Sequence, residues 1–567
     1  MSHVSLASFQ LSAAYWRVSP QLTGRFGCSV RNPELLRDRT DRVDGAALSD
    51  SELTFQSQTQ TPTEGEVYIE LGQHRFNGSN ASENNGGPDS AESPVEPESG
   101  FNVATIEDIP PDGGYGWICT VCVFMINANT WGVNACWAIF LDRYLTFGIY
   151  PGATKLQYAM IGGLSISQAL LISPLVTVFQ KWIGTRYTML LGAAIIWTAL
   201  FSASAATQIW QLFMSMAFCF GWGMGLIYIP AMALLPPWFS SRRSLAVGLA
   251  TSGAGLGGLA FSLITGRLIA VSGVAWTYRI LSFISLACNA ICALLVRERP
   301  LSSAAAARSA CRVYRFPRDF ARTQILLVVC WGFLTEFGYV ALWYSLPNYA
   351  TSIGLDPTQG SIVQSLLSLG LGLGRPVVGY YSDKVGRINI ALGMTLLCGI
   401  LCLTLWILAR SYVGLLIFAA SAGVVSGTFW STVSPILAEV VGIAEAGSTF
   451  GAICFALVLP TTFAEGIAMQ LVKGEQGSQQ FLDSQIFVGC MFVAGAVSLW
   501  LLRSWKIYEI ESKAADEQQL QDQHPTAVFG LATMSTTASA SARGGPSSAA
   551  ARIAWLTPRR LFMPRRV

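Results

Sequence analysis

Long apolar segments, separated by short polar breaks, fill residues 117–502. Twelve of them have the length that an α-helix needs to cross a bilayer, about 20 residues. They lie near 117–141, 156–179, 188–206, 210–235, 245–271, 278–296, 324–347, 359–381, 388–409, 412–437, 448–470 and 484–502. The pattern predicts an all-α membrane protein with twelve transmembrane helices.

Polar segments divide the chain into five regions. The longest internal break carries seven arginines and leaves six apolar runs on either side. Both ends of the chain are rich in small and polar residues that cannot bury a core, so we expect them to be disordered. The expected regions are a disordered N-terminal tail at 1–108, a six-helix half at 109–296, a basic central loop at 297–323, a second six-helix half at 324–502 and a disordered C-terminal tail at 503–567.

The distribution of Lys and Arg predicts the orientation in the membrane. If the N-terminus is inside, thirteen basic residues lie in the inner loops and four in the outer loops. Cytosolic loops of membrane proteins carry such an excess of positive charge. We therefore expect both termini and the central loop to be cytosolic. The expected membrane is the plasma membrane, with the vacuolar membrane as the alternative.

Composition supports the membrane class and argues against several others. Charged residues make up 12% of the chain, against about 25% in an ordinary soluble domain. The net charge of +3 gives no reason to expect nucleic acid as a partner. The thirteen cysteines are scattered without the paired spacing of a zinc site or a disulfide framework. No nucleophile–base pair or cofactor motif is visible, so we expect neither an enzyme nor a bound cofactor.

The segment "GYYSDKVGR", Gly379–Arg387, follows the eighth apolar run. A small residue, an acid four positions later and a closing Gly-Arg resemble the loop motif of the major facilitator superfamily. We expect Asp383 to face a helix amino terminus or a basic partner, and Arg387 to cap helix carbonyls. The motif would then act as a gating loop.

Two further segments resemble the monocarboxylate transporter family of that superfamily, and its fungal branch most. They are "PPDGGYGW", which leads into the first apolar run, and "WFSSRRSLAVG", which leads into the fifth. The matching residues are Asp112, Gly113, Gly114, Tyr115, Gly116 and Trp117, then Phe239, Arg242, Arg243, Leu245, Ala246 and Gly248, with Ser241 where the family has lysine. The resemblance implies a major facilitator fold, in which two six-helix halves alternate around a central site.

Directly after the second motif, "GAGLGG" also fits the glycine pattern of a dinucleotide-binding loop through Gly253, Gly255 and Gly258. Such a loop needs a preceding strand in a soluble βαβ unit. This segment lies inside an apolar run, so we interpret the glycines as close helix packing.

Arg375, in "LGLGRPVVGYYSD", is a charge inside the eighth apolar run. An arginine at the centre of a spanning helix costs at least about 2.5 kcal/mol, so a partner is expected. The resemblance aligns Arg375 with the family arginine that binds the substrate carboxylate. It also places Leu371 and Ala135 where the family carries the aspartate and lysine of its proton pathway. The anion-binding group is therefore retained, and the proton-coupling pair is absent.

Glu336 is the best candidate for a partner of Arg375. At about 1.5 Å of rise per residue, Glu336 lies about 18 Å from the inner end of its run and Arg375 about 12 Å. Glu465 lies nearer the outer surface. Two roles remain open for the pair of Glu336 and Arg375: substrate binding with coupling, or a structural salt bridge.

Polar residues also line one face of the first apolar run. Asn127, Thr130, Trp131 and Asn134 recur at helical spacing. Asparagine in a spanning helix should face the bundle or a water-filled path. The stripe, and Asn127 and Asn134 in particular, would therefore line the substrate cavity or form hydrogen bonds between helices.

These observations predict a secondary active or facilitative transporter of a small organic solute, a monocarboxylate or another carboxylate-bearing metabolite. Efflux of a fungal secondary metabolite is the alternative within the same class, and a solute sensor is the alternative outside it. The expected partners are the organic anion and, as a candidate co-substrate, protons. Membrane lipid is a further expected partner, through the arginine-rich end "TPRRLFMPRRV".

Overall fold

The computed structural model describes residues 110, 112–150, 152–299, 322–472, 479–523, 557, 559–560 and 563. All of them belong to the compact unit formed by residues 98–567. The expected N-terminal tail and most of the central loop lie outside the described residues. Every regular element in the described part is helical, which confirms the predicted all-α class.

The first half contains six helical crossings, several of them interrupted. The first crossing is made of four short elements, the second and fourth are also divided, and the fifth and sixth are joined in one long helix. The elements are α1 (Tyr115–Asn127), the π-helix η3 (Ala128–Gly132), α2 (Val133–Ala135), α3 (Trp137–Phe147), α4 (Lys155–Leu171), α5 (Ser173–Ile183), α6 (Thr185–Ala203), α7 (Ile209–Leu212), η4 (Phe213–Cys219), α8 (Phe220–Leu234), η5 (Pro236–Trp238) and α9 (Arg243–Leu295).

The second half also has six crossings, but they are interrupted at other places. Its third crossing continues into a π-helix, its fourth is divided at Gly427 and its fifth at Leu457. The elements are α12 (Thr323–Ser352), α13 (Pro357–Val385), α14 (Arg387–Leu401), η7 (Cys402–Trp406), α15 (Tyr412–Ser426), α16 (Thr428–Val440), α17 (Ile443–Ala456), α18 (Val458–Gln470) and α19 (Leu482–Gln523).

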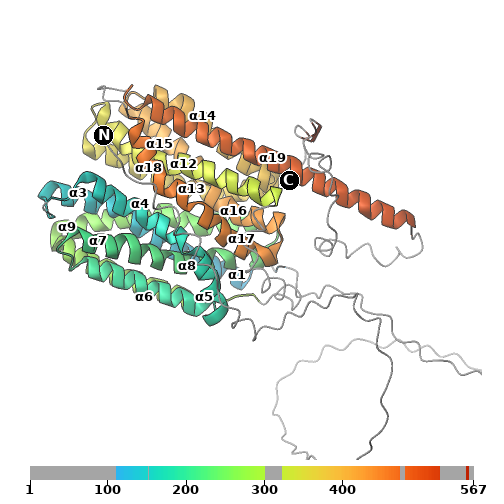
Figure 1. Ribbon diagram of the computed structural model, residues 1–567, viewed down its shortest axis with the longest axis horizontal. Helices are drawn as coiled ribbons and strands as arrows, with labels where there is room; N and C mark the ends of the chain where they lie inside the picture. The colour runs from blue at the N-terminus through green and yellow to red at the C-terminus, as the bar shows by residue number, and fades with distance from the viewer. Residues whose placement is uncertain are drawn as a thin grey trace, which may run out of the picture. The chain divides into compact units, whose positions relative to one another are not determined.

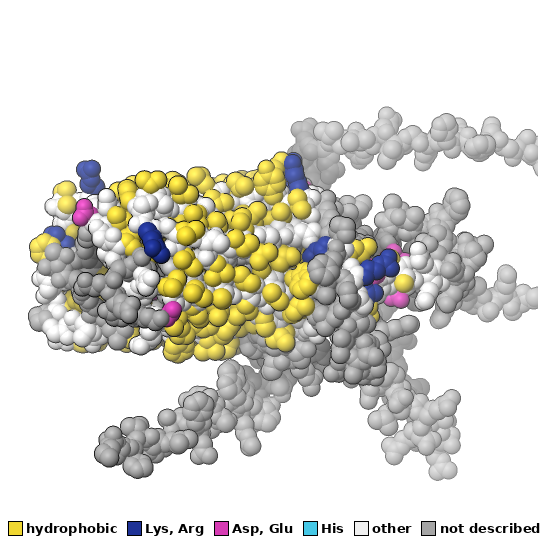
Figure 2. Space-filling view, turned by 90° about the horizontal axis from the view of Figure 1, so that it is seen from above, with side chains coloured by type: hydrophobic (Ala, Val, Ile, Leu, Met, Phe, Trp, Pro, Cys, Tyr) yellow, Lys and Arg dark blue, Asp and Glu magenta, His cyan; other side chains and the backbone are white. Residues whose placement is uncertain are grey.

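The helices of the described part are long and apolar enough to cross a membrane ten times, or eleven times if α4 and α5, which bend by 47°, form one span. One of these helices, α9, contains two of the predicted spans, because Gly273 breaks it with a left-handed φ of 78°. The twelve predicted runs are thereby accounted for. Figure 2 shows one face, where hydrophobic side chains cover the middle and Lys and Arg lie toward the ends.

The two halves form two groups of helices that meet along several pairs (Figure 1). The most extensive contact joins α9 of the first half to α13 of the second, and α4 of the first half also contacts α18 of the second. Glycines bring the backbones of α9 and α13 together: Gly248 faces the Arg375 backbone, and Gly379 faces Ser244. The predicted role of the "GAGLGG" glycines in helix packing is also confirmed, because Gly255 lies against the backbone of Gly372.

The last helix is longer than the sequence analysis predicts. We expected a disordered tail from residue 503, but α19 continues to Gln523 and runs past the neighbouring helices (Figure 1). Its extension is rich in Ala, Gln, Glu and Lys, which favour helix. Glu509 also forms ion pairs of 2.9 Å with Lys506 and 2.7 Å with Lys513, at helical spacing. Local helix propensity therefore outweighs the low hydrophobicity of this segment.

Replacing Gly255 by alanine should destabilise the contact between the halves. A Cβ there would lie 2.6 Å from Ser368 O and Gly372 N, and such overpacking typically costs about 1–3 kcal/mol. Gly266→Ala is the matched control on the same helix, since its Cβ would meet nothing within 4 Å. We expect the melting temperature of the purified protein to fall for Gly255→Ala and to stay or rise for Gly266→Ala. Equal melting temperatures would contradict the packing described here.

Candidate functional site

The two signature motifs of the sequence meet at one end of the bundle. Asp112, before α1, accepts four hydrogen bonds from the loop before α9. The backbone N–H groups of Ser240 and Ser241 lie 2.5 and 2.9 Å from its Oδ1, and their hydroxyls lie 2.6 and 2.9 Å from its Oδ2. Burial raises the pKa of Asp112, but the hydrogen bonds outweigh this and lower the pKa to about 2. An ionised carboxylate therefore ties the start of α1 to the start of α9.

The glycines after Asp112 form the turn that aims its carboxylate. Gly114 has a left-handed φ of 60°, which favours glycine. The backbone N–H of Gly116 donates to the carbonyl of Gly113 at 3.2 Å. Asp112 itself has a φ of 52°, a conformation that aspartate tolerates better than most residues.

Aromatic rings reinforce the same junction. The rings of Trp117 and Phe239 meet edge to face with centroids 5.0 Å apart, and those of Tyr115 and Trp238 lie 6.1 Å apart. Gly116 leaves room for this packing, since a Cβ there would lie 3.0 Å from both Trp238 and Phe239. The two motifs are thus the two sides of one structural junction.

The paired arginines of the second motif lie in different environments. Arg243 is buried, and its Nε donates to the carbonyls of Pro236 at 3.1 Å and Phe239 at 2.8 Å. Arg242 is exposed. Arg243 therefore holds the loop before α9 in shape, whereas Arg242 faces the surroundings.

The Asp383 motif joins the two halves at this same end, which we call the Asp383 end. The carboxylate of Asp383 accepts the backbone N–H groups of Ser244 at 3.0 Å and Leu245 at 2.9 Å, at the amino terminus of α9. Arg387 donates to the Ser240 carbonyl at 2.7 Å and forms an ion pair of 3.5 Å with Glu439. Negative charge at a helix amino terminus is stabilising, so these contacts hold the halves together. Their role as a gate stays a prediction.

Arg375 lies buried between the halves, with 4% of its surface exposed. Its Nη1 donates to the carbonyl of Thr251, on α9 of the opposite half, at 2.6 Å. Among the residues that the structure describes, its Nε has no hydrogen-bond partner. Gly427, at the break between α15 and α16, leaves the space beside this Nε, since a Cβ there would lie 2.7 Å away.

Glu336, on α12, is also buried, with 2% of its surface exposed, and it lies near Arg375 of α13. Its charge interacts with that of Arg375 and its carboxyl interacts with the Trp430 side chain. However, within the described part of the chain no ion pair of 4.0 Å or less joins Glu336 to Arg375. The predicted neighbourhood is present, but the direct salt bridge that we held open is not. The Thr251 carbonyl draws the guanidinium toward the first half, away from Glu336.

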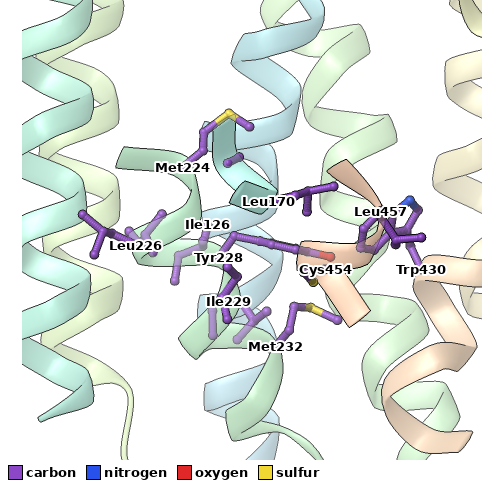
Figure 3. Close-up of a cluster of buried hydrophobic side chains, with 14 of the residues drawn as sticks. Ile126, Leu170, Met224, Leu226, Tyr228, Ile229, Met232, Trp430, Cys454 and Leu457 are labelled. Carbon is purple, nitrogen blue, oxygen red and sulfur yellow. The ribbon is translucent and has the colours of Figure 1, made fainter. Parts of the chain in front are cut away.

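Three aromatic rings from both halves meet one another, and two of them, Tyr228 and Trp430, interact with this part of the site. Trp131 of η3 meets Tyr228 of α8 edge to face at 5.3 Å, and Trp430 of α16 lies 6.1 Å from Trp131 and 6.0 Å from Tyr228. Figure 3 shows Tyr228 reaching from α8 toward Cys454 of the second half. Both Arg375 and Glu336 interact with the Tyr228 hydroxyl. We call Trp131, Tyr228 and Trp430 the central aromatic triad.

The polar stripe of the first crossing lies partly on the π-helix η3. The Nδ2 of Asn127 donates to the Val123 carbonyl of its own helix at 2.9 Å, and the Oδ1 of Asn134 accepts from the Ser165 hydroxyl of α4 at 2.8 Å. Asn134 therefore forms the hydrogen bond between helices that was one of the two alternatives. A substrate contact of either asparagine stays a prediction.

Sequence reasoning did not identify Thr251, Tyr228 or Trp430 as parts of the site. Thr251 takes part through its backbone carbonyl, which no side-chain pattern reveals. Tyr228 and Trp430 are aromatic residues in the middle of apolar runs, where core packing is the ordinary interpretation. Their polar groups were the available signal, because a buried Tyr or Trp usually needs a hydrogen-bonding partner.

Comparisons with known proteins agree with the observed fold. Residues 116–465 match the family model of the Major Facilitator Superfamily. The chain is 32% identical over 424 residues to a Saccharomyces cerevisiae protein named "Probable transporter MCH2", a match that covers 72% of this chain and 88% of the relative. It is 27% identical over 395 residues to the MFS transporter asaE of Aspergillus flavus, covering 68% and 87%.

Solved structures show the same fold at low sequence identity. The proton:xylose symporter XylE, bound to 6-bromo-6-deoxy-D-glucose, matches with a TM-score of 0.52 and 14% identity, covering 68% of this chain and 95% of that one. The fucose:proton symporter FucP of E. coli matches with a TM-score of 0.52 and 13% identity, covering 68% and 98%. At these identities the likeness shows the fold alone.

Replacing Asp112 by asparagine should weaken the junction in a pH-dependent manner. The pKa of Asp112 is about 2 in the folded protein and about 3.9 in the unfolded chain. The ionised carboxylate therefore stabilises the folded protein fully above about pH 3.9, and this contribution is lost as the pH falls toward 2. We expect a lower melting temperature for Asp112→Asn at neutral pH and a narrowing difference from wild type below about pH 4.

Asp356→Asn is the matched control, since Asp356 caps only its own helix, α13. It should cost about 1 kcal/mol or less and leave the loop before α9 unchanged. A difference between wild type and Asp112→Asn that stays constant down to pH 2 would exclude the charged carboxylate as its cause.

Proposed function

The chain belongs to the Major Facilitator Superfamily and is a membrane transporter of that type, and we propose that it carries an organic carboxylate bound by Arg375. The observation that carries the proposal is the buried guanidinium of Arg375 between the two halves. Its Nε lacks a partner among the described residues, and Glu336 does not pair with it directly. A substrate carboxylate would satisfy that donor and balance the charge.

The buried Arg375 guanidinium would destabilise the protein if no negative charge balanced it. A buried charge without a paired and hydrogen-bonded partner is strongly destabilising. The Thr251 carbonyl satisfies one N–H of the guanidinium but supplies no full negative charge. Arginine also offers a planar fork that matches a carboxylate with two parallel hydrogen bonds. The site is therefore better suited to an anion with planar oxygens than to a neutral sugar.

The central aromatic triad supports a substrate with an apolar body. Trp131 and Tyr228 come from the first half and Trp430 from the second, so a solute bound beside Arg375 would contact both halves. Movement of the halves would expose the site to one side and then to the other. In this scheme the Asp383 end forms and breaks its contacts with α9 during each cycle.

Membership of the monocarboxylate transporter family is part of this proposal. The support is the junction built by its two signature motifs around Asp112. Ala135 and Leu371 replace the charged pair of that family, and Ala135 lies beside Gly258 whereas Leu371 packs near Gly427. We therefore propose that Glu336 carries the proton if transport is proton-linked.

Efflux of a larger secondary metabolite is the second candidate, since the stripe with Asn127 and Asn134 is uncharged. For either direction we propose that the Asp383 end faces the cytosol and that the protein works in the plasma membrane, as the distribution of Lys and Arg predicts. Metabolites inside and outside cells, compared with and without the gene, would identify the solute and the direction.

Arg375→Lys tests the role of the guanidinium. Lysine keeps the charge but loses the planar fork, and a hydrogen bond to a charged group is worth about 1.5–3 kcal/mol. We expect at least about tenfold weaker binding of the best carboxylate found in a thermal-shift screen, and a matching loss of flux in proteoliposomes. Arg267→Lys, an exposed arginine on α9, is the control. Unchanged binding in Arg375→Lys would refute the proposed anion site.

Glu336→Gln tests proton coupling separately. Glutamine is a neutral substitute of the same shape, so it cannot release or take up a proton. We expect Glu336→Gln to abolish accumulation driven by a pH gradient while exchange down a concentration gradient continues. Glu465→Gln is the matched comparison, because Glu465 is a further carboxylate in the middle of α18, and its side chain lies near Gly163 of α4. Loss of coupling in Glu465→Gln alone would transfer the role to that residue.

A further inference from the structure

The C-terminal part of α19 and the neighbouring helix α14 carry a small cluster of polar and aromatic side chains. Its members are Tyr508 and Glu511 on α19, Arg503 one turn earlier, and Asn389 on the neighbouring helix α14. Arg503 Nε donates to the Asn389 side chain at 2.7 Å, which joins the two helices. We call these four residues the α19 surface.

Part of the C-terminal segment lies on this surface. Arg560 Nε donates to the Glu511 carboxylate at 2.7 Å, and the Arg560 guanidinium lies 4.8 Å from the centre of the Tyr508 ring. Arg503 donates to the backbone carbonyl of Met563. Met563 itself is half-buried and packs against the main hydrophobic cluster. An ion pair, a cation–π contact, a backbone hydrogen bond and an apolar contact therefore converge on a few residues.

We propose that the α19 surface is a docking site for Arg560 and Met563 of the chain's own C-terminal segment, which bind it reversibly. The partner of Arg560 is then Glu511 of α19 and not anionic lipid, which was the expectation from sequence for the arginine-rich end of the chain. Residues 524–556 connect Arg560 and Met563 covalently to α19, and such a connection provides an effective concentration in about the millimolar range. Individually modest contacts are sufficient at that concentration.

The geometry favours this partner over the lipid surface. The ion pair is partly shielded, with 22% of the Arg560 side chain and 32% of the Glu511 side chain exposed. Arginine stacked on a ring and paired with a carboxylate is held more specifically than a cation near a charged membrane. Arg559, the neighbouring arginine, is exposed, so the two arginines provide an internal comparison.

Docking at this place would brace the second half at the Asp383 end. Arg503 donates hydrogen bonds both to the Met563 carbonyl and to the Asn389 side chain. Asn389 lies two residues after Arg387 in α14. Three residues later on α19, Lys506 donates to the backbone carbonyl of Glu439 at 2.9 Å. Glu439 is the residue that pairs with Arg387. The segment is therefore connected, through α14 and α19, to the contacts that join the halves.

The test uses the full-length protein in phosphatidylcholine nanodiscs, with spin labels at Ala515→Cys on α19 and Thr557→Cys in the segment, both exposed positions. The accessible or undescribed cysteines of the background are first replaced by serine; they are Cys28, Cys219, Cys311 and Cys490. Pulsed electron spin resonance then measures the distance between the labels. We expect a narrow short-distance population in this background, which declines when salt screens the charges.

Charge reversal identifies the partner. Arg560→Glu or Glu511→Arg should each reduce the short-distance population about fivefold, and the double variant, which restores opposite charges, should recover it. Arg559→Glu makes the same change in net charge and should leave it unaltered. The recovery in the double variant also excludes misfolding as the cause of the loss.

Three results would overturn the proposal. The first is a background protein without a short-distance population. The second is equal loss with Arg559→Glu, which would indicate non-specific attraction. The third is a short distance that appears only when phosphatidylserine is added to the nanodiscs, which would make lipid the partner.

Discussion

The close approach of α9 and α13 is the contact on which the rest of the structure depends. Gly248 and Gly379 remove the side chains that would separate the two backbones. Only at this separation can Asp383 cap the amino terminus of α9 and the Arg375 guanidinium reach the Thr251 carbonyl. In a bilayer, backbone and charged groups must find their partners within the protein. One helix pair therefore positions both the Asp383 end and the central site.

The two ends of this helix pair are held by different kinds of contact. At the Asp383 end the halves are joined by charge-assisted hydrogen bonds, in which the Asp383 carboxylate accepts the Ser244 and Leu245 N–H groups and Arg387 donates to the Ser240 carbonyl. At the centre, Arg375 and the central aromatic triad leave the guanidinium only partly satisfied. Under the proposed function, a substrate carboxylate would supply the missing partner of this guanidinium.

The signature motifs and the C-terminal segment act on the same end from two sides. Asp112 accepts hydrogen bonds from the loop before α9, and the Ser240 carbonyl in that loop accepts a hydrogen bond from Arg387. On the other side, the Glu439 carboxylate forms an ion pair with Arg387, and the Glu439 backbone carbonyl accepts a hydrogen bond from Lys506 of α19. Motifs that are more than a hundred residues apart in the chain thus form one continuous network around Arg387.

The sequence by itself determined the spans and the two halves, and it indicated that Arg375 would be buried in the protein and need a partner, since each follows from hydrophobicity or from the cost of a charge in lipid. It also indicated that Asp383 would face a helix amino terminus. Only the tertiary structure decided that this terminus belongs to α9, and that Arg375 turns to the Thr251 carbonyl and not to Glu336. The same holds for the contact of α19 with Arg560, whereas the length of α19 itself follows from local helix propensity. A backbone carbonyl, a glycine contact or a ring from the opposite half leaves no periodic signal, because each depends on residues brought together by folding.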